Sequence, residues 1–496
     1  MSEPKAQENK KDKAEEYIAS HAQDVNPRWY PRFHIAPRCG WCNDPNGMSY
    51  FQGAYHVFYQ YYPYEPKWGP MHWAHASSKD LVRWQREPVA LAPDKSYDAD
   101  GCFSGCGIEK DGSLYLLYTG HVDLPKKSGQ PDRIETQNLA VSRDGRSFEK
   151  FSQNPVMELP ETVSTGEDRH FRDPKVWRHG DRYYAVVGAQ TEENVGQVLL
   201  FESQDLKDWT FRQVMAKAEG NQGFMWECPN FAEFDGHEAL ILSPQGVKPE
   251  GHRYLNLHQS VVMSGRMDYE SGVFAHGDFE LLDYGFDFYA PQVVQTPDGR
   301  CLMLGWLAMW ESAMPEQADG WAGMMTIPRE LHYRNGHVVS VPARELADLR
   351  RTKHEQPDMT LREETSIADW ARETGELCVD FDLADAEGLT VHFVGGSDEK
   401  ISVRIEKESG TVCLSCKSAA MGSEENRWAK LSPSQEKFSL RVYQDRSSLE
   451  IFLNDGEAVM STRFYPRDGQ RALVIEPQEG AVTMTNGVFY ELDDIF

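Results

Sequence analysis

The sequence lacks several features that would place it in a membrane or in an exported class. No run of about 18 apolar residues occurs in the 496-residue chain, so we expect no membrane-spanning helix. Residues 1–16 are rich in Lys and Glu and have no apolar stretch, so they do not resemble a secretory signal peptide. We therefore expect a cytoplasmic protein.

Cysteine is scarce and shows no disulfide framework. The chain has 9 cysteines, an odd number, and without an export signal we interpret them as free thiols. No HExxH zinc motif occurs, and Cys413 and Cys416 form a pair on a predicted strand without other obvious ligands. The sequence therefore predicts no zinc site.

Basic residues are also in deficit. Asp and Glu number 78 against 51 Lys and Arg, which gives a formal net charge of -27. Such a charge repels nucleic acids and anionic membranes, so neither is an expected partner. The 40% hydrophobic content supports well-packed cores, and the chain length indicates two or more domains.

A five-fold repeat organises the first two thirds of the chain. In each repeat a turn containing Gly is followed by a short apolar run that is typical of a strand. The successive Gly positions differ by 59, 68, 56 and 63 residues, and they are Gly53, Gly112, Gly180, Gly236 and Gly299.

A second repeat has the same period and a different phase. A Ser-x-Asp turn precedes an aromatic residue three times, with the Asp residues 64 and 61 positions apart: Asp80 before Trp84, Asp144 before Phe148 and Asp205 before Trp209. Five units of about four strands indicate a five-bladed β-propeller. Unrelated hairpins in a sandwich are the alternative, although they would not explain the shared period.

The last third of the chain has a different pattern. Apolar and polar residues alternate over 401–405, 438–442 and 449–453, and the last run leads into the turn Asn454-Asp455-Gly456. This period of two predicts an antiparallel β-sandwich. We expect an all-β protein with an N-terminal extension (1–25), a propeller (26–343), a linker that holds a short helix (344–358) and a sandwich (359–496). A further helix is expected over 12–21.

Three acidic residues occupy similar places in the propeller repeat. Asp44 and Glu227 each lie 9 residues before their repeat Gly, and Asp173 lies 7 before its own; Ser104 and Ala290 occupy the slot in the other two units. Because the first strands of all blades line one axis, these carboxylates should meet. Singly, each could be a turn residue or part of a structural ion pair. Together they indicate an acid/base site.

The motifs around these positions resemble glycoside hydrolase family 32, which comprises invertases, sucrose-6-phosphate hydrolases, inulinases and levanases. The motifs are Trp41-Cys42-Asn43-Asp44-Pro45-Asn46-Gly47, Phe103-Ser104-Gly105, Phe171-Arg172-Asp173-Pro174 and Trp226-Glu227-Cys228-Pro229. The resemblance extends from about Asn26 to the end and implies the same propeller and sandwich. The lead from Val25 to Pro37 is similar to the intracellular sucrose-6-phosphate hydrolases.

The resemblance implies that Asp44 is the nucleophile, Glu227 the acid/base and Asp173 the carboxylate that binds fructose hydroxyls. It implies a retaining β-fructofuranosidase acting on sucrose, sucrose 6-phosphate or short fructo-oligosaccharides, with a sugar as partner and no metal or cofactor. Oligomeric state is left open. The expected substrate-binding residues are Asn43, Gln60, Trp68, Phe103, Ser104, Arg172, Tyr289 and Trp310.

Two positions depart from the family pattern, with Cys42 where Met is usual and Phe103 where Trp is common. Cys42 adjoins the predicted nucleophile, so we expect a thiol reagent to inhibit. We also expect Trp226, Phe224 and the Asp44 charge to raise the pKa of Glu227, so that it is neutral at rest.

Several functions remain open at this stage. A fructosyltransferase, or an exo-acting inulinase or levanase, would use the same carboxylates. A non-catalytic sugar-binding propeller would be expected to lose one of them, and an arabinanase-type hydrolase lacks these motifs. The sequence does not identify phosphate ligands; Lys67 and Arg133 are examples of basic residues expected near the mouth of the site.

Overall fold

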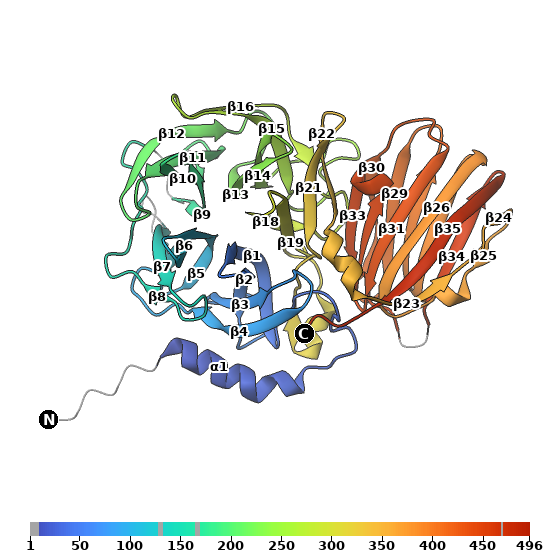
Figure 1. The fold of residues 1–496 in the computed structure, drawn as a ribbon, viewed down its shortest axis with the longest axis horizontal. Helices are drawn as coiled ribbons and strands as arrows, with labels where there is room; N and C mark the ends of the chain where they lie inside the picture. Colours follow the sequence, from blue (N-terminus) through green and yellow to red (C-terminus); the bar gives the residue numbers. More distant parts are fainter. Residues whose placement is uncertain (1–8, 127–131, 164–168, 468–469) are drawn as a thin grey trace.

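The structure, a computed structural model, describes residues 9–126, 132–163, 169–467 and 470–496. Within these residues the chain forms five small sheets arranged around a central axis, followed by two larger sheets packed face to face (Figure 1). This is the predicted propeller followed by a sandwich. None of the described helices is long and apolar enough to cross a membrane.

The five blades are antiparallel sheets, and each begins with its innermost strand. The first blade is β1 (Gly40–Phe51), β2 (Ala54–Tyr62), β3 (His72–Ser78) and β4 (Trp84–Leu91). The second is β5 (Gly101–Lys110), β6 (Ser113–Asp123), β7 (Arg133–Ser142) and β8 (Glu149–Lys150), and the third is β9 (Phe171–His179), β10 (Arg182–Gln190), β11 (Gly196–Ser203) and β12 (Trp209–Lys217). The fourth is β13 (Met225–Phe234), β14 (His237–Gln245), β15 (Val261–Asp268), β16 (Val273–His276) and β17 (Glu280–Leu281), and the fifth is β18 (Tyr289–Gln295), β19 (Cys301–Trp306), β21 (Arg329–Arg334) and β22 (His337–Pro342).

The repeat glycines lie in the turns that join the first and second strands of the blades. All five have a positive φ, and a Cβ atom at any of them would meet nothing within 4 Å. Glycine is therefore favoured at these turns by backbone conformation and not by lack of space. The first predicted repeat is confirmed.

The Ser-x-Asp repeat forms the turns between the third and fourth strands of the first three blades. In the first turn the Ser78 hydroxyl donates to Asp80 Oδ1 at 3.0 Å, and the same oxygen accepts the backbone N–H of Arg83 at 2.7 Å. Asp144 and Asp205 make the equivalent contacts with Ser142 and Ser203. These side chains replace the backbone hydrogen bonds that a tight turn leaves unmade.

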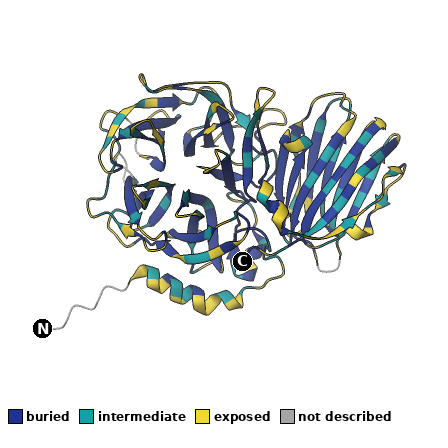
Figure 2. Ribbon diagram, viewed as in Figure 1, coloured by how far each residue is buried: buried dark blue, intermediate teal, exposed yellow. Residues whose placement is uncertain are grey.

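The propeller closes as a ring of its innermost strands. β1, β5, β9, β13 and β18 contact one another in that order, and β18 returns to β1. The short strand β20 (Trp321–Ala322), which lies in the connection inside the fifth blade, pairs in parallel with β1 and so joins the last blade to the first. Figure 2 shows that the inner strands are mostly buried.

The sandwich is formed by two antiparallel sheets with an apolar core between them. One sheet holds β23 (Arg350–Glu355), β24 (Met359–Leu361), β26 (Gly375–Asp385), β31 (Lys437–Asp445), β32 (Ser448–Leu453), β33 (Ala458–Arg463) and β35 (Ala481–Leu492). The other holds β25 (Thr365–Ser366), β27 (Gly388–Gly396), β28 (Glu399–Glu406), β29 (Thr411–Ser418), β30 (Ser423–Lys430) and β34 (Ala472–Gln478).

The segment expected to be a linker is mostly part of the sandwich. Its first residues form the predicted short helix, η3 (Arg344–Leu349), but the next form β23, which pairs with β35 at the edge of a sheet. The sequence Arg-Arg-Thr-Lys-His-Glu is polar because both faces of this edge strand are largely exposed. Because the strand has no alternating apolar residues, the hydrophobic pattern of the sequence does not indicate it.

Helical structure is confined to short segments within the described residues. The expected helix is present as α1 (Lys10–His21), which is capped by the Asn9 side chain and lies along β4 of the first blade. The remaining helical pieces are single 3-10 turns: η1 (Ala22–Asp24), η2 (Pro315–Asp319), η4 (Ala368–Trp370) and η5 (Asn454–Gly456).

Fully buried charges join the propeller to the sandwich. His34, ahead of the first blade, contacts Asp445 Oδ2 at 2.8 Å and Glu450 Oε1 at 2.9 Å, both in the sandwich sheet. Arg329 on β21 forms ion pairs with the same Glu450 and with Asp283. All of these side chains have 0% exposure, so each charge is stabilised by a partner and not by water.

The protonated His34 side chain should stabilise the fold up to alkaline pH. Burial opposes its charge, but hydrogen bonds to Asp445 and Glu450 outweigh burial and raise the pKa from 6.5 to about 9. Because the pKa is raised on folding, this stabilisation is complete below pH 6.5 and disappears as the pH passes through about 9. We expect a loss of up to about 3 kcal/mol over this window.

Urea unfolding at about pH 6 and about pH 9.5 measures this loss. In His34→Gln the free energy of unfolding should fall less between these two pH values, because the His34 contribution is missing. His337→Gln changes an exposed histidine and should show the same fall as the wild type. Equal pH slopes in the wild type and His34→Gln would contradict the assignment.

Candidate active site

A β-bulge interrupts each innermost strand near the start of the blade and directs side chains toward the axis. The bulge lies between Cys42 and Pro45, Phe103 and Gly105, Arg172 and Lys175, Glu227 and Asn230, and Tyr289 and Gln292. A bulge twists and bends its strand, which re-aims the side chains beside it.

The three carboxylates converge, as predicted, but they do not share one slot. In its own strand, Glu227 is the last residue paired with the neighbouring strand before the bulge. Asp173 is the first unpaired residue of its bulge, and Asp44 is the second unpaired residue of its bulge. The equal spacing of Asp44 and Glu227 from Gly was therefore misleading. A second bulge in β1, between Asn46 and Ser49, adds a residue to the number that separates Asp44 from Gly53.

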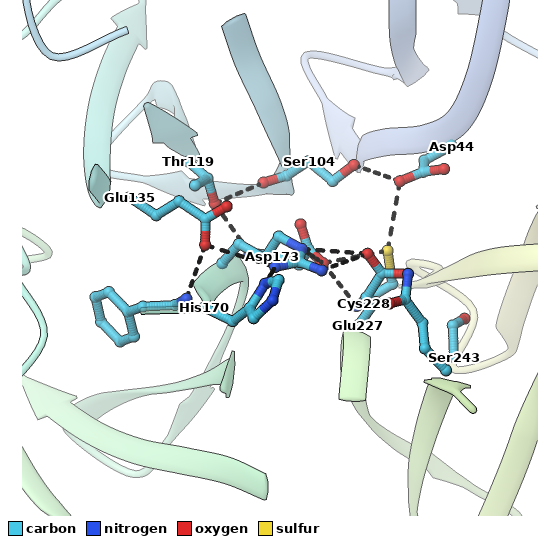
Figure 3. A network of polar contacts seen from close by, with 12 residues as sticks. Asp44, Ser104, Thr119, Glu135, His170, Asp173, Glu227, Cys228 and Ser243 are labelled. Atoms are coloured by element: carbon cyan, nitrogen blue, oxygen red, sulfur yellow. Dashed lines mark hydrogen bonds and ion pairs between the residues drawn. The ribbon is translucent and has the colours of Figure 1, made fainter. Parts of the chain in front are cut away.

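Asp44 accepts hydrogen bonds from a neighbouring blade and from its own strand. The Ser104 hydroxyl donates to its Oδ2 at 2.6 Å (Figure 3). The Asn43 amide donates to its Oδ1 at 3.0 Å. Burial raises the pKa of Asp44, while these two donors act to lower it. The donors favour the ionised form, which is the form that a nucleophile requires.

Glu227 is held by three donors from three elements. Arg172 donates to Oε1 from Nε at 3.2 Å and from Nη2 at 2.7 Å, while Gln245 and Tyr289 donate to Oε2 at 2.7 and 2.5 Å. Burial raises the pKa of Glu227, but the Arg172 charge and the Tyr289 and Arg172 hydrogen bonds outweigh it and hold the pKa below its usual value. The expected rest-state neutrality of Glu227 is therefore wrong for the free site.

The expected causes of that neutrality are also misplaced. The Trp226 side chain packs away from the carboxylates, against Phe279 and Gly196, and its indole N–H donates to the Gln222 carbonyl. Phe224 is 38% exposed. Adjacent strand residues face opposite sides, so a neighbour in sequence does not desolvate Glu227.

Asp173 carries the proton that this crowded site retains. It is 4% exposed, and its Oδ2 accepts the backbone N–H of Cys228 at 3.0 Å. Burial is the largest cause that raises its pKa to about 8; Arg172 opposes it, and the Glu227 and Asp44 charges add to it. Asp173 and Glu227, which share the Arg172 guanidinium, therefore titrate together.

Cys228, which the sequence analysis did not assign, sits between two of the carboxylates. Its thiol lies 3.5 Å from Asp44 Oδ2 and 3.7 Å from Asp173 Oδ2. Cys42, where inhibition by a thiol reagent was expected, is fully buried in the apolar core behind the strand, and burial raises its pKa. Cys42 therefore faces the core and not the carboxylates, whereas Cys228 faces the carboxylates. Inhibition by a thiol reagent stays a prediction.

A second layer positions Arg172, and sequence reasoning missed it. Glu135 on β7 accepts the backbone N–H of Phe171 at 2.8 Å and lies 3.6 Å from Arg172 Nη1. His121 contacts the same Glu135 at 3.3 Å, and His170 contacts the Arg172 guanidinium. A Glu-Thr-Gln run on a third strand of a blade has no distinctive spacing, so only the fold reveals it.

The other expected binding residues surround this centre to different degrees. Asn43 accepts from the Trp41 indole at 2.8 Å, and Trp310 stacks on the same indole at 5.9 Å between centroids. Phe103 stacks on His121 at 4.1 Å and meets the edge of Trp68, which is 45% exposed.

Gln60 is buried and its amide donates to the Cys102 carbonyl, so its described contact is with the backbone of the next blade. All nine cysteines are free thiols, including a second C-x-x-C pair, Cys39 and Cys42. Among the described residues, no group of three or more His, Cys, Asp or Glu side chains is arranged to hold a metal ion.

Comparison with known proteins matches both domains of the chain to one family. Residues 34–342 match the glycosyl hydrolases family 32 N-terminal domain, and residues 345–491 match the family 32 C-terminal domain. The raffinose invertase of Escherichia coli is 40% identical over 94% of this chain and 95% of its own length. A sucrose-6-phosphate hydrolase of E. coli is 41% identical over the same shares.

Solved structures give the same result. The GH32 beta-fructofuranosidase of Bombyx mori is 35% identical with a TM-score of 0.86, covers 99% of both chains, and has been solved with sucrose. The sucrose-6-phosphate hydrolase of Lactobacillus gasseri has a TM-score of 0.86 at 27% identity over 97% of both chains.

The chain has a five-bladed propeller with converging carboxylates, followed by a sandwich. Its relatives cleave sugars and match it over nearly its whole length, so these features together define a glycoside hydrolase. The chain belongs to glycoside hydrolase family 32, and its activity is that of a fructosidase.

Tyr289→Phe should shift the alkaline limb of the pH profile of hydrolysis to higher pH. The Tyr289 hydroxyl favours the ionised form of Glu227, so its removal raises the pKa of that carboxyl. An acid that must be protonated then stays active to higher pH, and the alkaline limb of kcat/KM should move upward. Tyr333→Phe, on the fifth blade, is the control. A limb that stays in place or moves downward would exclude this coupling.

Proposed function

We propose that the protein is a retaining β-fructofuranosidase, with Asp44 as nucleophile, Glu227 as acid/base and Asp173 as the carboxylate that binds fructose hydroxyls. The observation that carries the proposal is the convergence of these residues from three blades, each with donors suited to its task. Sucrose, sucrose 6-phosphate and short fructo-oligosaccharides are the proposed substrates.

In the first step the glycosidic bond breaks at the anomeric carbon of fructose. Glu227 gives its proton to the leaving oxygen, and an Asp44 oxygen forms a bond to the anomeric carbon. Ser104 and Asn43 hold Asp44 ionised and oriented for this attack. The products are a free aglycone and a fructosyl ester of Asp44.

In the second step Glu227, now ionised, takes a proton from water while the water oxygen attacks the anomeric carbon. The bond to Asp44 breaks and fructose leaves with its original configuration. Arg172 and Tyr289, which favour the ionised form of Glu227, assist this step. Two carboxyl groups about 5–5.5 Å apart would suit such a double displacement.

Substrate binding must move the retained proton toward Glu227. In the free site Asp173 holds it, because burial raises the Asp173 pKa to about 8. Fructose hydroxyls that donate to Asp173 favour its ionised form, and that added negative charge in turn raises the pKa of Glu227. Binding thus prepares the acid only when a sugar is present.

Both basic residues suggested as phosphate ligands already form an ion pair with a neighbouring carboxylate. Lys67 is exposed and paired with Glu65 at 2.6 Å. Arg133 donates to both oxygens of Asp132, at 2.9 and 3.1 Å. A phosphorylated substrate would have to compete with these partners, so we expect sucrose and sucrose 6-phosphate to be cleaved at rates of the same order.

Azide should rescue Glu227→Ala on a substrate with a good leaving group. A fructosyl ester forms without the acid, but no base activates water, and azide needs no base. The expected product is β-fructofuranosyl azide, which has the configuration of the substrate. NMR of the product measures this outcome.

Asp44→Ala is the matched control, because it lacks the proposed ester-forming oxygen and should give no azide product of retained configuration. Both variants should lose several orders of magnitude in kcat. An α-configured azide product from Glu227→Ala would exclude a fructosyl-Asp44 intermediate.

A comparison of kcat/KM on sucrose, sucrose 6-phosphate, kestose and inulin tests the substrate class. We expect the disaccharides and kestose to exceed inulin, since the named relatives act on small sugars. Product analysis at high sucrose separates hydrolysis from transfer to a second sugar. A preference for inulin would indicate an exo-inulinase instead.

A further inference from the structure

The propeller axis contains a cavity beyond the catalytic residues. It has a volume of about 320 Å³ and is lined by residues of all five innermost strands, among them Ser49, Lys175 and Val293. Lys175 lies two residues after Asp173, and Ser49 lies five after Asp44, farther along the same strands. The cavity is therefore displaced along the axis from the carboxylates, toward the opposite face.

Lys175 is buried in this cavity without an acidic partner. The residue is 6% exposed, and its ammonium donates to the Val293 carbonyl oxygen. No carboxylate among the described residues lies within ion-pairing distance of it. A buried ammonium without a counter-charge is costly, because the carbonyl offers only a partial charge.

Ser49 contributes a second unpaired polar group to the wall of the same cavity. It is 4% exposed, and its hydroxyl has no hydrogen-bond partner among the described residues. A Cβ atom at Gly107 would lie 3.1 Å from that hydroxyl and 2.6 Å from the Gly47 carbonyl oxygen. Glycine at position 107 therefore allows β5 to approach β1 closely beside Ser49.

The walls around these polar groups are apolar and aromatic. Trp177 and Phe231 stack with their centroids 4.5 Å apart at an angle of 22°, and Ile108 and Met48 line the cavity with them. A few polar groups within apolar walls are typical of sites for small organic molecules, and the volume lies in their usual range.

We propose that this cavity binds a small organic carboxylate, whose anionic group pairs with Lys175 and accepts from Ser49 while its apolar part packs on Trp177 and Phe231. The ligand supplies the counter-charge that the fold leaves out. This site is separate from the fructoside site and does not depend on the catalytic roles proposed above.

The charges that face Lys175 give the binding a defined pH dependence. Burial lowers the pKa of Lys175, and the nearest titratable groups are the Cys106 and Cys301 thiols, which burial keeps neutral. The rim carries exposed Glu109, Arg178 and Glu233; β1 and β18 line the cavity without a charged residue. An anion favours the protonated amine, so binding weakens as the pH rises into the range where Lys175 loses its proton.

Benzoate is a suitable probe, and benzamide, which has nearly the same shape without charge, is its control. Calorimetry with saturating fructose present should detect benzoate with a Kd of about 1 mM or tighter. Benzamide should bind at least about tenfold more weakly, the loss expected for a charged hydrogen bond.

Three variants test the assigned residues. Lys175→Met should weaken benzoate binding about tenfold or more, and Ser49→Ala should weaken it less. Glu233→Gln removes a repelling charge at the rim and should tighten binding by about twofold, a gain that a misfolded variant could not produce. Urea unfolding verifies that each variant is folded.

Equal affinities of the wild type and Lys175→Met would overturn the proposal. So would the absence of saturable benzoate binding to the wild type, or its loss on addition of fructose, which would place benzoate in the catalytic site. If Lys175→Met does not fold, unchanged affinities in both Ser49→Ala and Glu233→Gln would also overturn it.

Discussion

A single guanidinium makes the acidic centre of this enzyme possible. Arg172 lies within reach of Glu227, Asp173 and Glu135, and without its charge these side chains could not be buried together in ionised form. Burial, together with the remaining repulsion, raises the pKa of Asp173 and so favours one proton in the site. A site that is slightly short of positive charge holds both a base and a source of protons, as two-step acid/base chemistry requires.

The sequence predicted the parts of the fold that repeat and the parts that alternate. Gly53 and its equivalents, and the turn at Asp80 and its equivalents, recur because each blade needs the same backbone conformation at the same place. The sandwich was evident because one face of each sheet is apolar. β23 was missed, since an edge strand needs no apolar face.

The converging carboxylates were predicted for a partly wrong reason. Their convergence follows from the repeat, but their equivalence fails, because a bulge adds a residue without leaving a mark in composition. The direction of the Glu227 pKa was missed for a similar cause. It is set by Tyr289, Gln245 and Arg172, which lie on other strands and reach the carboxylate only in the folded ring. Glu135 and Cys228 were hidden in the same way.

The contacts that complete the first blade also fix when the enzyme can become active during its synthesis. β1 carries Asp44 and is among the first strands to leave the ribosome, but its neighbour β20 is made only near the end of the propeller. His34, just ahead of β1, finds its partners Asp445 and Glu450 in the last part of the chain. A nascent chain therefore holds Asp44 in an unfinished sheet until the last blade has been made, and a product truncated before β20 lacks the strand that joins the last blade to the first.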